Sequence, residues 1–259
     1  MEEKNKNAGS FSGFVLLEEK KWNKEQFKKD FIEDWNLKPV YEEGDGAKED
    51  ENDTDVVIME LNDQKVVLGY MSIPVPDGEA EKNAAYNYTW KNAVEVTKNH
   101  KAYMVVMILG VHEDIKADGE LFVKVVSTLC KQENVIGVYT NGVVYQPEFY
   151  FAMKEALEND IYPLMGLIWF HLVREESGCS LYTMGMKNFG MDEMEIINTK
   201  ENPIEVRDFL MEIASYCIEE EVILQDGETI GFTEEQICKI TRSEGVYIGD
   251  MTLKIDYRE

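Results

Sequence analysis

The chain of 259 residues is poor in cysteine and contains no long apolar run, and each absence excludes a class of protein. Its longest apolar runs, such as residues 103–111, are too short to span a membrane. Residues 1–10 are charged and polar, without the apolar segment of a signal peptide. The cysteines form no Cys-x-x-Cys pair, so neither a zinc knuckle nor a disulfide framework is indicated: Cys130, Cys179, Cys217 and Cys238. We therefore expect a cytoplasmic protein.

Basic residues are also scarce. The 26 lysines and arginines face 51 acidic residues, so the formal net charge is -25. A field of this sign repels nucleic acid and anionic membranes, and it attracts basic proteins and cations. We expect no nucleic-acid or membrane partner. The charge can serve solubility alone, or it can attract a specific basic protein.

Catalytic signatures are missing as well. The chain has no phosphate-binding Gly-rich loop, no His-Glu-x-x-His and no Gly-x-Ser-x-Gly, and it holds three histidines. The trio of residues 112–114 offers potential metal ligands, but adjacent side chains rarely point at one ion. His171 lies in an apolar strand pattern on the same side as Trp169, which is typical of a buried structural histidine. We expect no metal site, no cofactor and no catalytic residue.

The spacing of apolar residues predicts an α+β fold. In the first half, a β-α-β-β-α-β order with a further helix is typical of a ferredoxin-like unit. Its elements are expected at residues 14–17, 23–35, 56–61, 66–73, 90–100, 102–109 and 120–131. Residues 42–55, rich in Asp and Glu, are expected to form a solvated loop between the first helix and the hairpin.

The second half repeats this order. Its elements are expected at residues 135–139, 147–159, 164–173, 180–184, 203–217 and 221–224, and further strands at 229–232, 238–241 and 251–257. We therefore predict two tandem ferredoxin-like units with antiparallel sheets, at residues 12–131 and 132–259, the second with a C-terminal β extension. Since no low-complexity linker separates the halves, cooperative packing of the units is expected.

One segment, residues 183–196, places glycines among methionines and an aromatic residue. Gly185 and Gly190 permit sharp turns or a close backbone approach. The methionines suit either a binding surface or ordinary core packing. If residues 191–197 form a strand, Glu193 and Glu195 share one face; paired carboxylates can perform acid–base chemistry, but acids on a solvated strand face are commoner.

This segment resembles the bacterial family catalogued as domain of unknown function 4261. The resemblance includes a Gly-x-x-x-Phe-Gly-x-x-Glu-Met-Glu stretch beginning at Gly185 and an Asp-Gly-x-Thr-x-Gly turn beginning at Asp226. It also includes Pro74 and Pro76 after a strand, Trp90 at a helix start and His100 before a strand, so it extends over residues 14–257. It implies a bacterial cytosolic protein, with relatives beside toxin–immunity and secretion-related genes, and it implies no activity.

Two functions follow as hypotheses. The first is a non-enzymatic interaction protein, adaptor-like or immunity-like, that binds a basic partner through an exposed sheet face. The alternative is a small-molecule-binding protein or an unrecognised enzyme with a site between the two units. The predicted site residues are Gly185, Phe189, Gly190, Glu193 and Glu195.

Overall fold

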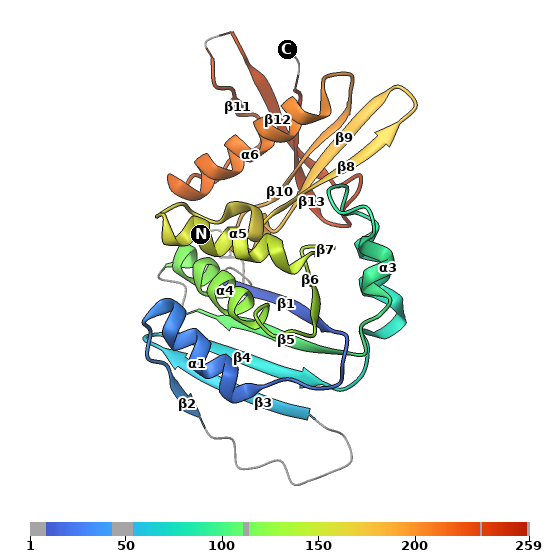
Figure 1. Ribbon diagram of the computed structural model, residues 1–259. Helices are drawn as coiled ribbons and strands as arrows, with labels where there is room; N and C mark the ends of the chain where they lie inside the picture. Colours follow the sequence, from blue (N-terminus) through green and yellow to red (C-terminus); the bar gives the residue numbers. More distant parts are fainter. Residues whose placement is uncertain (1–8, 43–53, 111–113, 234, 258–259) are drawn as a thin grey trace. The chain divides into compact units, whose positions relative to one another are not determined.

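The chain forms two compact units in a computed structural model that describes residues 9–42, 54–110, 114–233 and 235–257. One unit runs from Gly9 to Leu167, and the other begins at Ile168 (Figure 1). The predicted division fell after residue 131. The observed boundary lies later because residues 135–140 pair with the first strand of the chain and residues 143–145 pair with them in turn, so both strands belong to the N-terminal sheet.

The N-terminal unit is built on a seven-stranded sheet with the order β2-β3-β4-β5-β1-β6-β7. Its strands are β1 (Ser10–Leu17), β2 (Val40–Glu42), β3 (Thr54–Leu61), β4 (Gln64–Met71), β5 (Ala102–Leu109), β6 (Val135–Thr140) and β7 (Val143–Tyr145). Its helices are α1 (Lys24–Trp35), α2 (Glu79–Ala84), α3 (Ala93–Thr97), α4 (Ile115–Leu129) and α5 (Pro147–Glu158). Every strand pair in this sheet is antiparallel.

Local sequence signals explain several of these elements. The Asn23 side chain caps α1 by accepting a hydrogen bond of 3.0 Å from the Gln26 N–H. Asn62 turns the β3–β4 hairpin with a positive φ of 53°. Pro147 begins α5, where its missing N–H has no cost. The strand predicted over residues 102–109 is confirmed as β5.

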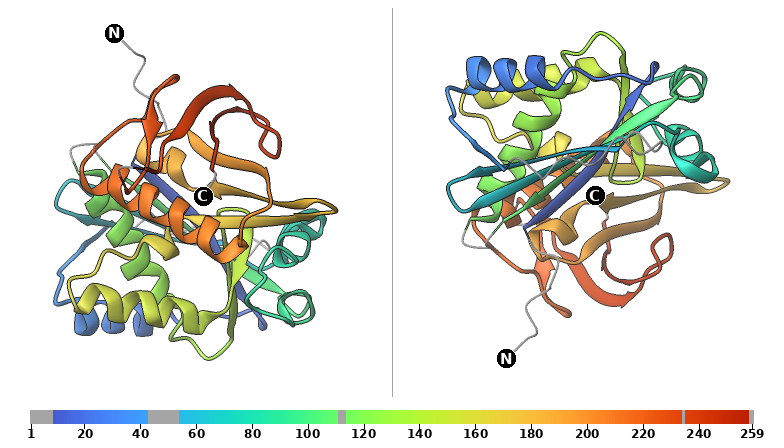
Figure 2. Two further views of the ribbon diagram at one scale, coloured as in Figure 1. Left: turned by 90° about the horizontal axis from the view of Figure 1, so that it is seen from above. Right: turned by 90° about the horizontal axis from the view of Figure 1, so that it is seen from below.

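Helices cover the two faces of this sheet unequally. Helix α4 contacts β1 and β5 and lies beside α1 and α5 on one face (Figure 2). There, Phe122 of α4 meets Phe11 of β1 at a ring distance of 6.4 Å. On the other face, α2 and α3 contact β6 and β7. Their alanines pack with Leu16 and Tyr103 in a second, smaller core. The rest of this face is formed by β3, β4 and β5.

The C-terminal unit holds a six-stranded sheet with the order β11-β12-β13-β10-β9-β8. Its elements are β8 (Trp169–Glu175), β9 (Gly178–Met184), β10 (Glu193–Thr199), α6 (Pro203–Glu219), β11 (Thr229–Ile230), β12 (Cys238–Glu244) and β13 (Met251–Ile255). Strands β10 and β13 are parallel neighbours, and the other pairs are antiparallel. The buried stripe of α6, which includes Val206, Leu210 and Ile213, covers β8 and β9.

The α+β class is confirmed, with six α-helices among the described residues and two sheets rich in antiparallel pairs. The tandem ferredoxin-like units are not confirmed. A split β-α-β arrangement needs parallel strands in each unit, yet the N-terminal sheet pairs β1 with β5 and β6 antiparallel. Residues 221–224, predicted as a strand, form none. The predicted C-terminal extension is instead central, because β13 pairs with both β10 and β12.

Two further expectations concern residues whose position is not described. Residues 43–53 of the predicted acidic loop lie outside the described residues, as do His112 and Glu113 of the potential metal ligands. Asp114 is described, and its side chain caps α4 by accepting a hydrogen bond from the Ala117 N–H. No helix within the described ranges is long and apolar enough to cross a membrane.

Candidate functional site

The first predicted site residue, Glu193, anchors the turn between β9 and β10. Its buried carboxylate accepts hydrogen bonds from the Thr183 hydroxyl at 2.7 Å and the Gly185 N–H at 2.8 Å. The N–H groups of Met186 and Lys187 donate to it at 3.2 and 3.3 Å. Burial raises the pKa of Glu193, and these hydrogen bonds only partly oppose that rise. The carboxylate thus organises backbone within its own unit.

Glu195 performs the same task for a different loop. Its carboxylate, with no exposed surface, accepts hydrogen bonds of 3.0 Å from the N–H groups of Val246 and Tyr247 in the β12–β13 loop. The Thr252 hydroxyl donates at 3.1 Å, and the Lys254 ammonium forms an ion pair at 2.9 Å. Burial alone would raise the pKa of Glu195, but the backbone N–H groups and Lys254 outweigh it and lower that pKa.

The two glutamates do share the strand β10, and both are buried rather than solvated. Alternation places them on one side of the strand, but it does not reveal that loops cover that side. The two covering loops also meet each other, because Lys187 and Asp250 form an ion pair. The carboxylate oxygens of Glu193 and Glu195 are occupied by donors from neighbouring residues, which is the geometry of structural anchors rather than of acid–base catalysts.

The two glycines serve the turn itself. Gly185 has a φ of 129° and Gly190 a φ of 79°, which are positive values that favour glycine. Between them lies the short 3₁₀ helix η3 (Met186–Phe189), whose Met186 and Phe189 side chains are buried. Met186 therefore packs in the core, in agreement with ordinary core packing rather than a binding surface. The five predicted residues are close together along one turn and strand.

A stack of three rings lies beside Glu195. The rings of His171 and Tyr182 are parallel at 4.5 Å, and Tyr247 stacks on Tyr182 at 5.3 Å. The Tyr247 hydroxyl donates to the Glu175 carboxylate at 2.6 Å. His171 is buried and meets Trp169 edge to face at 6.4 Å, so the predicted structural histidine is confirmed. Through Tyr247, the stack adds a second contact to the β12–β13 loop, whose N–H groups donate to Glu195.

The second motif stretch joins the same region. The Asp226 carboxylate accepts a 2.8 Å hydrogen bond from the Arg242 N–H, and the Arg242 guanidinium pairs with Asp192 at 2.5 Å. Gly231 lies against backbone, because an added Cβ would stand 1.7 Å from the Gln236 carbonyl oxygen. Residues of the two motif stretches therefore connect the β9–β10, β11–β12 and β12–β13 segments within the C-terminal unit.

Cysteine and histidine chemistry has little support among the described residues. The four cysteines are buried, and burial raises the pKa of the Cys217 thiol to about 11. His100 receives the Val75 N–H at Nε2 at 2.9 Å, and its Nδ1 lies 2.6 Å from the Thr97 carbonyl oxygen, so one neutral tautomer satisfies both contacts. No cluster of metal-ligating side chains occurs in the described parts of the chain.

An apolar surface that no sequence motif marks lies on the N-terminal sheet. Across β3, β4 and β5, residues paired in register place apolar side chains on the face away from α4. We call the following residues of this face the open sheet face: Val56, Ile58, Val67, Met107 and Leu109. Val56 is 52% exposed, and Met107 and Leu109 are 38% and 39% exposed. The signal in the sequence was the continuous apolar run of β5, which leaves no polar face.

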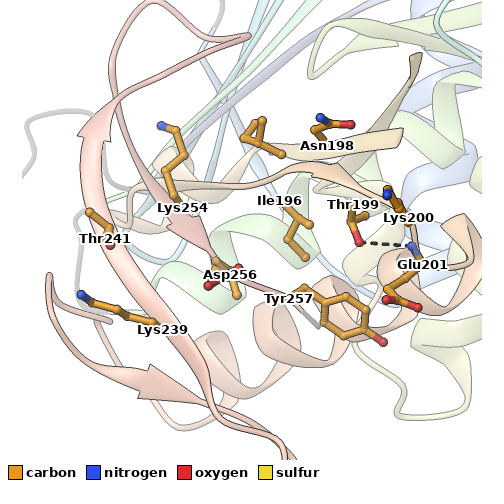
Figure 3. Close-up of a pocket in the computed structure, with 12 residues that line it drawn as sticks. Ile196, Asn198, Thr199, Lys200, Glu201, Lys239, Thr241, Lys254, Asp256 and Tyr257 are labelled. Carbon is orange, nitrogen blue, oxygen red and sulfur yellow. Dashed lines mark hydrogen bonds between the residues drawn. The ribbon is translucent and has the colours of Figure 1, made fainter. Parts of the chain in front are cut away.

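A pocket of about 600 Å³ opens on the C-terminal sheet beside the ends of β10 and β13 (Figure 3). Its walls come from β10 and the connection to α6, from β12, and from the end of β13. The five predicted site residues are not among the described residues that line it. Sequence patterns could not indicate this pocket, because the lysines that line it lie on three separate segments of the chain: Lys200, Lys239 and Lys254.

Fold and site define an α+β protein whose C-terminal unit is organised by two short motifs, the first of which holds two buried carboxylates. Residues 182–256 match the family model described as Domain of unknown function (DUF4261), which confirms the resemblance. The match runs from β9 to just beyond β13 and includes both motif stretches. Pro74, Pro76, Trp90 and His100, also used for the resemblance, lie outside it. No curated protein and no solved structure matches the chain.

Proposed function

We propose that this chain is a non-catalytic, cytoplasmic interaction protein, adaptor-like or immunity-like, that binds a basic protein through the open sheet face. The observation that carries the proposal is the exposure of apolar side chains on a face where polar ones are the rule. An antiparallel sheet covered on one side normally alternates apolar and polar residues. In β5, both alternating sets are apolar: Val106 and Ile108 are buried, whereas Met107 and Leu109 face away from the core.

The apolar residues of this face adjoin one another, and half-buried ones connect those that are exposed. Met107 pairs with Val67 of β4, and Val67 pairs with Ile58 of β3. Single exposed apolar residues are ordinary on a protein surface, but contiguous exposed patches mark interaction sites. The patch therefore favours a partner protein with an apolar centre of its own.

Charge selects the kind of partner. At the margin of the open sheet face, Lys65 pairs with Glu42 at 3.0 Å and with Glu60 at 3.5 Å, so the acids there outnumber the base. The chain as a whole carries a net charge of -25. Opposite charge speeds association and makes it sensitive to salt. A basic rim around an apolar centre is the complementary surface.

The alternative, a ligand or enzymatic site built on Gly185, Phe189, Gly190, Glu193 and Glu195, is less supported. Phe189 and both carboxylates are buried, and the carboxylates are engaged by hydrogen bonds inside the C-terminal unit. Recruiting either carboxylate to a ligand would break those hydrogen bonds and leave buried donors unpaired, which costs free energy.

The experiment begins with capture of partners on the tagged full chain at low salt, elution with a salt gradient and mass spectrometry. The purified partner is then titrated against Met107→Lys and against a control, Ile161→Lys. Both positions are exposed, at 38% and 61%, and both variants change the charge equally. Since a charge placed inside an apolar contact must be desolvated, Met107→Lys should weaken binding by about tenfold or more. The control should not.

Each outcome bears on a separate part of the proposal. Equal affinities of the two variants would remove the open sheet face as the docking surface. Binding that is indifferent to ionic strength would remove the electrostatic selection of a basic partner. Self-association that Met107→Lys abolishes would show that a second copy of the chain, rather than a basic protein, occupies the face.

A further inference from the structure

The pocket beside β10 and β13 arises where two parallel strands separate. They pair with each other only as far as Glu195 and Lys254. Beyond these residues, β10 continues along β9 to Thr199, whereas β13 continues along β12 through Ile255. The space between the diverging ends has a volume of about 600 Å³, within the ordinary range for small-molecule sites (Figure 3).

Its position suits a ligand. In sheets with parallel strands joined by helical crossovers, ligands bind outside the carboxyl ends of the strands. The pocket lies at the carboxyl ends of β10 and β13. Helix α6 follows β10 through Lys200 and Glu201, which line the pocket, and begins after the cap residue Asn202. The amino end of this helix of 17 residues adds a partial positive charge nearby.

The lining lysines are unusual in a chain with so few bases. Lys200 comes from the β10–α6 connection and Lys239 from β12, and both side chains are exposed. Neither lysine forms an ion pair with any described residue, whereas Lys254 is already matched by Glu195 at 2.9 Å. Figure 3 shows Lys239 and Lys254 on one side of the pocket and Lys200 on the other, with Ile196 and Tyr257 between them.

The other residues that line the pocket restrict the class of ligand that fits it. Ile196 and Ile255 supply apolar surface, while Asn198 and Thr241 supply neutral hydrogen-bonding groups. Glu201 also lines the pocket, and its carboxylate can accept hydrogen bonds. A ligand with negative charge alone would meet repulsion there, whereas one that also carries hydroxyl or amino donors would satisfy both kinds of group.

From this arrangement we infer that the pocket binds a small organic molecule that carries a carboxylate or phosphate group together with hydroxyl or amino donors. The oxyanion lies with Lys239, and the donors face Glu201 on the opposite side of the pocket (Figure 3). This site is separate from the open sheet face, because its lining residues belong to the other unit.

The test is isothermal titration of the full chain at constant ionic strength with two probes, citrate and ribose 5-phosphate. Both probes carry hydroxyl groups, and they differ in whether a carboxylate or a phosphate supplies the charge. Saturable binding of either probe is expected, and the probe that binds identifies the oxyanion. Lys239→Gln should weaken binding by about tenfold, the loss of one charge-assisted hydrogen bond, and Lys200→Gln by less, because Lys200 lies across the pocket.

The matched control is Lys98→Gln, which removes an exposed lysine of the other unit and should leave affinity unchanged. Far-UV circular dichroism of each variant confirms that the fold is retained. The inference is overturned if neither probe binds saturably. It is also overturned if Lys98→Gln weakens binding as much as the pocket variants, because the attraction would then belong to the whole chain and not to this pocket.

Discussion

Replacing Glu195 with glutamine should destabilise the C-terminal unit strongly. The carboxylate is fully buried and receives two backbone N–H groups, a hydroxyl and the Lys254 ammonium. Glutamine keeps the volume but replaces one acceptor oxygen with an NH₂ donor, which would face donors. Breaking a buried ion pair from one side costs about 3–5 kcal/mol. Because the Lys254 side chain retains 19% exposure and can reach water, we expect about 3 kcal/mol, the lower end of that range.

The pH dependence has a defined sign. The folded-state pKa of Glu195 is lowered, so its contribution to stability is present above the unfolded-state pKa of about 4.3 and is lost as the pH falls through the folded-state pKa. The difference between the wild type and Glu195→Gln should therefore shrink in acid. Glu193, with a raised pKa, has the opposite sign, since its folded state binds a proton at higher pH than its unfolded state.

The assay is urea unfolding followed by tryptophan fluorescence. Trp169 is buried in β8 of the same unit, and replacing Trp22, Trp35 and Trp90 with phenylalanine leaves Trp169 as the reporter of this unit. The control is Glu176→Gln, an exposed residue that loses the same charge. A loss of free energy no larger than that of the control would refute the anchoring role. So would a wild-type advantage that stays constant in acid.

Three further outcomes follow from the conformation, exposure and burial of single residues. Gly185→Ala should cost about 1–3 kcal/mol in urea unfolding, because its φ of 129° disfavours a side chain, whereas Gly249→Ala, with nothing near its Cβ position, should cost little. Arg242→Gln should cost less than about 1 kcal/mol by the same measurement, since its pair with Asp192 is exposed to solvent; a larger loss would show that this pair matters more than its exposure indicates. The four cysteines are buried, so a thiol reagent should label none quickly in the native protein and all after unfolding; rapid native labelling would contradict their burial.

Much of the local structure could be predicted from the sequence. The period of apolar residues located α1, α5 and α6, and the cap at Asn23 and the proline at Pro147 marked where two of these helices begin. These signals act within a few residues of chain, where hydrogen bonding and steric preferences are decided by neighbours. The glycines at 185 and 190 were interpreted correctly as turn positions for the same reason.

The candidate site was only partly predictable. Alternation correctly placed Glu193 and Glu195 on one strand, but whether that side is wet or dry depends on the β12–β13 loop. That loop follows about fifty residues later in the chain, and its N–H groups convert a surface carboxylate into a buried anchor. The open sheet face and the lysine-lined pocket likewise combine segments that carry no common pattern in the sequence.

By itself, the sequence determined the class of the fold, most helices and strands, the acidity of the chain and the motif stretches that the family match confirmed. Tertiary structure alone decided which strands distant in the chain pair, and with them the unit boundary and the sheet order. The pairing of β6 with β1, for example, joins residues more than a hundred positions apart. Period and propensity record which face of an element is apolar, whereas the partner that covers this face is selected by packing between distant segments.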